Sequence, residues 1–146
     1  MMKTKDLLLL IGILFVCITG CQDITEGYLE VDEASYTPDT LYVYKTLDPV
    51  NDAVRIREDA PWVSLAIEGV LGTAQIHYSV ENVTAPELGE AAAKIVKDEL
   101  TIRGGGIMQY PLKNQAQPGT YKVSVRVTNP GYSKVIQDAM TIIVKD

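Results

Sequence analysis

The residues of this chain with the clearest chemistry are one cysteine near its start and a set of tyrosines. Cys21 directly follows Ile18-Thr19-Gly20, and a cysteine thiol is a nucleophile that can be acylated. Eight tyrosines accompany a single phenylalanine and a single tryptophan. A tyrosine ring packs against apolar surfaces while its hydroxyl reaches a polar partner. The expected chemistry is therefore covalent attachment at Cys21 and non-covalent binding by aromatic rings.

Catalytic and metal chemistry have little support in the sequence. His77 is the only histidine and belongs to no motif, so we expect it to be a surface residue of a strand. Zinc usually takes four Cys or His ligands, which this chain cannot supply. Asp48, Asn51 and Asp52 share one loop, but their spacing is not that of a calcium-binding EF-hand. We expect no enzyme, no metal and no cofactor.

Four tyrosines are candidates for contact with a ligand. Tyr42 and Tyr44 share one face of a short alternating segment, and Leu41 and Val43 share the other. If the leucine and valine face the core, the two rings form a small platform suited to the apolar C–H face of a sugar. The other two candidates lie in or beside turns, where binding residues often gather: Tyr110 and Tyr132. The alternative is that all four rings simply fill strand positions.

The first 20 residues are expected to be a signal peptide that is removed. Lys3 and Lys5 precede an uncharged run over residues 7–18, which is shorter than the roughly 20 apolar residues that span a bilayer. Cys17 would be lost with this segment, which leaves Cys21 without a disulfide partner. An ordinary secretory signal with a free thiol at residue 21 is the alternative, and an uncleaved anchor helix is disfavoured by the short run.

The order of these features resembles a bacterial lipoprotein signal, in which the cysteine is acylated and becomes the new N-terminus. The acidic residues Asp23 and Glu26 resemble, more loosely, the surface-export signal of Bacteroidales lipoproteins. The resemblance implies lipid attachment at Cys21 to the outer membrane, and it implies exposure at the cell surface. A plain solvated spacer is the alternative for residues 22–26, and it leaves a periplasmic orientation open.

Length and charge restrict the remaining chain to one domain with few classes of partner. Residues 21–146 carry 11 basic and 18 acidic side chains, a net charge of −7. This balance argues against nucleic acid and anionic lipid headgroups as partners. The length fits one domain. We expect an acidic tether with a possible first strand over residues 21–35, followed by a β-sandwich over residues 36–146.

Alternating apolar and polar residues predict one strand after another. The predicted strands cover residues 41–44, 53–57, 62–67, 76–80, 121–127 and 140–144. Within the second of these, Val54 and Ile56 are expected to face inward and the arginines outward. A short helix or irregular crossing is expected near residues 86–95, a strand near 99–103, and a turn at Gly104-Gly105-Gly106. Turns at this spacing indicate an all-β, antiparallel sandwich.

The stretch from Gln117 to Asn129 resembles the late strand of bacterial immunoglobulin-like domains of the PKD and cadherin-like kind. The resemblance implies an immunoglobulin-like sandwich in which the hydroxyl of Tyr121 bonds to backbone upstream. It makes Trp62 a candidate for the tryptophan between the sheets. Val123 stands where antibody domains have a cysteine, which implies a disulfide-free version. Such a fold carries no function of its own.

Two functions follow as expectations. The first is a lipid-anchored, non-catalytic module of the cell envelope that has a structural or assembly role beside a protein partner. The second is a surface module that binds glycans or proteins for a carbohydrate-uptake system, which the resemblance to Bacteroidales lipoproteins implies. An exposed cluster of aromatic rings rimmed by polar groups favours the second, and a flat apolar patch favours the first.

Overall fold

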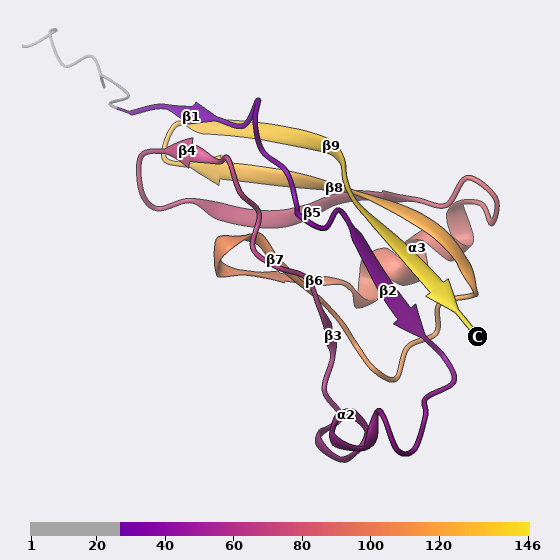
Figure 1. Ribbon diagram of the computed structural model, residues 1–146. Coiled ribbons are helices and arrows are strands. Elements are labelled where there is room, and N and C mark those ends of the chain that lie inside the picture. The colour runs from indigo at the N-terminus through magenta and orange to yellow at the C-terminus, as the bar shows by residue number, and fades with distance from the viewer. Residues whose placement is uncertain (1–26) are drawn as a thin grey trace, which may run out of the picture.

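The computed structural model describes residues 27–146, and these are built mostly of strands (Figure 1). The strands are β1 (Leu29–Glu30), β2 (Thr40–Tyr44), β3 (Trp62–Val63), β4 (Leu71–Gly72), β5 (His77–Thr84), β6 (Thr101–Arg103), β7 (Ile107–Tyr110), β8 (Gly119–Asn129) and β9 (Tyr132–Lys145). The helices of this part are α2 (Ala53–Glu58), α3 (Glu90–Glu99) and a 3-10 turn at Gly104–Gly106. The predicted all-β class is confirmed. The predicted signal peptide, Cys21 and the start of the tether lie outside the described residues.

The strands form a four-stranded sheet, β2-β9-β8-β5, a three-stranded sheet, β3-β7-β6, and the small pair β1-β4. The long β8–β9 hairpin is the centre of the larger sheet (Figure 1). One pair departs from the predicted antiparallel arrangement, because β2 runs parallel to β9 from Thr40 beside Thr141 to Tyr44 beside Lys145. Alternation in a sequence shows which side chains share a face, but it carries no information about strand direction.

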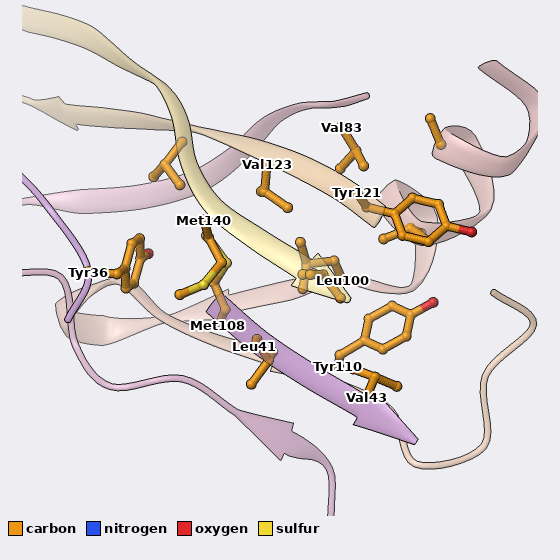
Figure 2. Packing of buried hydrophobic residues seen from close by; sticks show 14 of the residues in the cluster. Tyr36, Leu41, Val43, Val83, Leu100, Met108, Tyr110, Tyr121, Val123 and Met140 are labelled. Carbon is orange, nitrogen blue, oxygen red and sulfur yellow. The ribbon is translucent and has the colours of Figure 1, made fainter. Parts of the chain in front are cut away.

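The core lies where the inward faces of these strands meet. Tyr121, Val123, Val125 and Val127 of β8 are fully buried, which confirms the predicted alternation of this strand. Across the core, Met108 and Tyr110 of β7 are also fully buried, and Figure 2 shows part of the shared cluster. The hydroxyl of Tyr121 donates to the carbonyl oxygen of Gln117 at 2.8 Å, as the resemblance implied.

The crossing between β5 and β6 is a helix, and the predicted strand after it is present. Ala92, Ala93 and Val96 are buried on the face of α3 that packs near β5. The helix starts at Glu90, four residues later than the predicted start near residue 86. Residues 85–89 form a turn instead, in which the N–H groups of Leu88 and Gly89 both donate to the carbonyl of residue 85. The Gly104–Gly106 turn leads directly into β7.

The predicted strand over residues 53–57 is wrong, because this segment is the helix α2. The side chain of Asp48 accepts the backbone N–H groups of Val50 at 2.7 Å and Asn51 at 3.0 Å, and this local turn folds the chain into a helical start. Val54 and Ile56 consequently point to solvent, with 62% and 44% of their surface exposed. The alternation Val-Arg-Ile-Arg is equally compatible with one and a half turns of helix.

The predicted strand over residues 62–67 is present only as β3, the pair Trp62–Val63. Trp62 faces the core, whereas Val63 and Leu65 are exposed. Near the start of the described chain, β1 occupies part of the segment predicted as tether, and Leu29 and Val31 are buried in the core. Over residues 27–146, the helices are too short or too polar to cross a bilayer.

Candidate binding surface

Tyr42 and Tyr44 project outward from the edge strand β2. Leu41 and Val43, which alternate with them, are buried against the core. The two tyrosine side chains keep 45% and 39% of their surface exposed. The predicted division of this strand into an apolar inner face and an aromatic outer face is therefore present. Pairing with β9 along the whole strand gives both rings a fixed backbone.

A lysine from the last strand lies against both rings. Lys145 is directly paired with Tyr44 across the parallel β2–β9 ladder, so its side chain leaves the sheet on the same face. Its ammonium nitrogen lies 4.7 Å from the ring centre of Tyr42 and 6.0 Å from that of Tyr44. Within about 6 Å, an ammonium is attracted to the face of an aromatic ring. The lysine thus places a positive charge between the two rings.

Trp62 extends this group of rings toward β3. The ring centres of Tyr44 and Trp62 are 5.6 Å apart, with the two ring planes tilted by 51°. The guanidinium carbon of Arg55 lies 4.0 Å from the ring centre of Trp62, and an Arg55 nitrogen donates to the carbonyl of Pro61 at 2.9 Å. We call Tyr42, Tyr44 and Trp62, with the cations Arg55 and Lys145, the aromatic surface.

Trp62 is 9% exposed, and its ring is mostly covered. The indole N–H is buried and has no acceptor among the described residues. A buried donor without a partner usually calls for explanation, since leaving it unpaired costs about 1–3 kcal/mol. The guanidinium of Arg55 is one of the groups that cover this ring, and Arg55 belongs to the short surface helix α2.

Neither cation of the aromatic surface, Lys145 or Arg55, was predicted from the sequence. A strand over residues 53–57 predicts outward arginines with no link to Trp62. The helix α2 instead brings Arg55 onto the tryptophan ring. The signal that could have found it is the cluster Asp48–Asp52, because Asp and Asn side chains that bond to nearby backbone are typical of turns before helices.

The expectation that Tyr110 lies on the surface is wrong. Tyr110 is fully buried, and its hydroxyl donates to a carboxylate oxygen of Glu99 at 2.5 Å. Burial raises the pKa of its hydroxyl, and the bond to Glu99 raises it further. Met108 and Tyr110 share the inner face of β7, and this alternation was a signal of burial that the neighbouring turn obscured. Tyr132 is half-buried against the core at the β8–β9 turn, far along the hairpin from Tyr42 and Tyr44.

The remaining polar candidates do not come together as a catalytic or metal site. His77 is exposed on β5, as expected. Hydrogen bonds from the backbone of Asn51 and Val50 lower the pKa of the Asp48 carboxyl, which assigns this carboxylate to the turn. Between residues 27 and 146, no group of three or more His, Cys, Asp or Glu side chains is arranged to hold a metal ion.

Two hollows lie away from the aromatic surface. One, of about 380 Å³, lies between α3 and β5 over Val83, Ala85 and Ala93. The other, of about 440 Å³, lies between residues 34–39 and 136–139. Neither brings an aromatic ring and a free cation together, so the aromatic surface is the stronger candidate for ligand binding.

No protein-family model and no curated protein matches this chain. Among solved structures, the chain is similar to a SusE-like surface located polysaccharide binding protein from the Bacteroides thetaiotaomicron heparin utilisation locus. The similarity has a TM-score of 0.45 and 12% sequence identity, and it covers 76% of this chain and 15% of that one. The chain thus spans about a seventh of the length of that protein. At this level the similarity supports no argument about function.

Proposed function

We propose that this chain is a non-catalytic, lipid-anchored module of the cell envelope that binds glycans on its aromatic surface. The observation that carries the proposal is the pair of exposed rings, Tyr42 and Tyr44, held on one strand with the ammonium group of Lys145 beside them. This is an aromatic cluster rimmed by polar groups, which is the arrangement that favours glycan binding over a purely structural role.

The physical basis is the amphipathic character of both surfaces. A sugar ring has apolar C–H groups on its faces and hydroxyls around its rim. Exposed tyrosine rings remove the C–H groups from water, while the phenol hydroxyls and the Lys145 ammonium can bond to the rim. Because the tyrosines have few rotatable bonds and stand on a paired strand, little side-chain freedom is lost on binding.

Replacing Tyr42 and Tyr44 by alanine is expected to weaken glycan binding about tenfold for each ring, since a well-packed aromatic anchor contributes more than about 1 kcal/mol. Affinity electrophoresis against a panel of neutral and acidic polysaccharides measures the change. The matched control is Tyr28→Ala, which removes another exposed tyrosine from the opposite end of the domain. The proposal would be contradicted if the Tyr42→Ala and Tyr44→Ala variants were retarded as strongly as the unmodified protein by every polysaccharide that binds.

Attachment to the outer membrane, with the domain outside the cytosol, is the second part of the proposal. It is supported by the order of charged residues, uncharged run and Cys21 in the sequence. Cells grown with a labelled fatty acid should incorporate the label into the protein, and the Cys21→Ala variant should remain unlabelled. If the variant still incorporates the label, the proposed attachment of lipid at Cys21 is wrong. Protease treatment of intact cells then distinguishes surface exposure from a periplasmic position.

An immunoglobulin-like sandwich without catalytic activity is the third part. A four-stranded sheet, β2-β9-β8-β5, and a separate three-stranded sheet, β3-β7-β6, support a sandwich. The hydrogen bond from the Tyr121 hydroxyl to Gln117 supports the immunoglobulin-like family. The lack of catalytic activity is proposed because His77, the only histidine of the sequence, is exposed on β5 and belongs to no catalytic motif.

A structural or assembly role is a second candidate, favoured by apolar exposure over residues 50–65. Five large apolar side chains of this stretch are exposed: Val50, Val54, Ile56, Val63 and Leu65. Exposed apolar side chains gathered in one segment are typical of protein contacts. A photo-crosslinking residue at position 54 or 65 should then capture a partner protein in intact cells. The control is the same photo-crosslinking residue in place of Leu71, which is also exposed but lies outside residues 50–65.

A further inference from the structure

We infer that the glycan bound by the aromatic surface is anionic, carrying carboxylate or sulfate groups that Lys145 and Arg55 recognise. The inference rests on the proposed function and specifies its ligand class. It is argued from the contacts of these two cations.

The two cations lack the carboxylate partners that five other basic residues of the described chain have. Arg126 pairs with Glu81 at 2.6 Å, and Lys94 pairs with Asp98 at 2.5 Å. Across residues 27–146, neither Arg55 nor Lys145 forms an ion pair. The described residues hold four other basic side chains without an ion pair: Lys45, Lys97, Arg103 and Lys134. Arg55 and Lys145 differ from these four because both lie on the faces of one group of aromatic rings.

Both cations rest on aromatic faces instead. An exposed cation–π contact is weak, and it leaves the N–H donors unused. Lys145 has three such donors, and the Arg55 guanidinium has five, of which one bonds to Pro61. A carboxylate or sulfate would accept charge-assisted hydrogen bonds from them, which are roughly twice as strong as neutral ones. A neutral sugar would form weaker hydrogen bonds with the same donors.

The positions of the cations match a ligand that follows the rings. Lys145 lies between Tyr42 and Tyr44, and Arg55 lies beyond Tyr44 on Trp62. A saccharide chain stacked on the two exposed tyrosines would thus meet one cation between them and a second one beyond them, over the covered tryptophan. Two cations in succession suit a polymer with repeated acidic groups rather than a single charged end.

Overall charge cannot produce such a preference. The whole chain has a net charge of −6, which repels a polyanion at long range. A preference for an acidic polymer must therefore come from local contacts, and it must weaken as salt screens them.

The test compares polymers that share a backbone and differ in charge: polygalacturonate with its carboxyl-reduced form, and dextran sulfate with dextran. Trp62 is the only tryptophan, so its fluorescence reports on the aromatic surface alone. We expect at least tenfold tighter binding of the charged member of a pair at low salt, and loss of most of this ratio at high salt. Lys145→Gln and Arg55→Gln should bring the ratio toward one.

Lys134→Gln is the matched control, because Lys134 is exposed at the other end of β9 and should leave the ratio intact. Equal binding of charged and uncharged polymers, still sensitive to Tyr42→Ala, would overturn the inference and keep the proposed function. A preference that survives both glutamine substitutions would also overturn it. Absence of binding to every polymer would overturn the inference together with the proposed function.

Discussion

Gly69→Ala is expected to destabilise the fold far more than Gly105→Ala, although both glycines have a φ of +74°. A β-carbon at residue 69 would lie 2.2 Å from the carbonyl oxygen of Glu33, which is backbone and cannot rotate away. At residue 105 the nearest atom would be the β-carbon of Ala66 at 3.6 Å, an ordinary contact. The two substitutions therefore share the strain of a positive φ and differ in the clash.

The strain alone costs about 1–2 kcal/mol, and this is the loss expected for Gly105→Ala. Gly69→Ala should lose more than about 4 kcal/mol, since the segments around it must separate. Ser35 and Glu68 exchange two backbone hydrogen bonds of 3.0 and 2.9 Å directly beside the clash, and these would be broken. Urea denaturation followed by circular dichroism measures both. Similar losses for the two variants would mean that residues 33–35 do not pack against residue 69.

Raising the pH above 10 is expected to unfold the domain through its buried tyrosines. Burial raises the pKa of the hydroxyls of Tyr36 and Tyr110 well above the usual value of 10.0. Both hydroxyls donate hydrogen bonds at 2.5 Å, Tyr36 to the carbonyl of Gly106 and Tyr110 to Glu99, and ionisation would remove these donors. The unfolded chain releases these protons near pH 10, whereas the folded chain retains them.

Proton linkage gives the direction in which stability changes with pH. Below pH 10 both states hold the protons and this contribution to stability is complete; above it the unfolded state binds fewer protons, so stability falls as the pH rises. Near-ultraviolet absorbance of tyrosinate should show part of the tyrosines ionising only as the domain unfolds. Lysines titrate in the same range, so the control is the double variant Tyr36→Phe, Tyr110→Phe. An identical loss of stability with pH in this variant would assign the effect to other groups.

Alternation within single strands was sufficient to predict much of this fold. It put Leu41 and Val43 on one face of their strand and Tyr42 and Tyr44 on the other, and it found the inner face of β8. These predictions succeed because a strand buried on one face has a strict period of two. The same reasoning failed over residues 53–57, where hydrogen bonds of an aspartate side chain decide the local structure and the helix is too short for its period to show.

The candidate site was only half predictable, because half of it depends on contacts between distant segments. The two tyrosines could be placed from their own strand. Lys145 joins them only through the parallel β2–β9 pairing, and Arg55 reaches Trp62 only through α2. Tyr110 was misplaced because the turn after it outweighed the alternation of β7. Pairing partners and their direction come from the packing of the whole chain.

The hairpin β8–β9 separates the start of the described chain from the aromatic surface. The side chain of Asn129, beside the hairpin turn, bonds to the carbonyl of Tyr28 at 2.8 Å and so fixes the beginning of the described chain at that end. Tyr44 lies beside Lys145 at the other end of β9, roughly 40 Å away at the usual rise of a strand (Figure 1). If Cys21 carries the proposed lipid, the hairpin turn is the end of the domain where the chain from the membrane enters, and the rings lie at the end of β9 away from it.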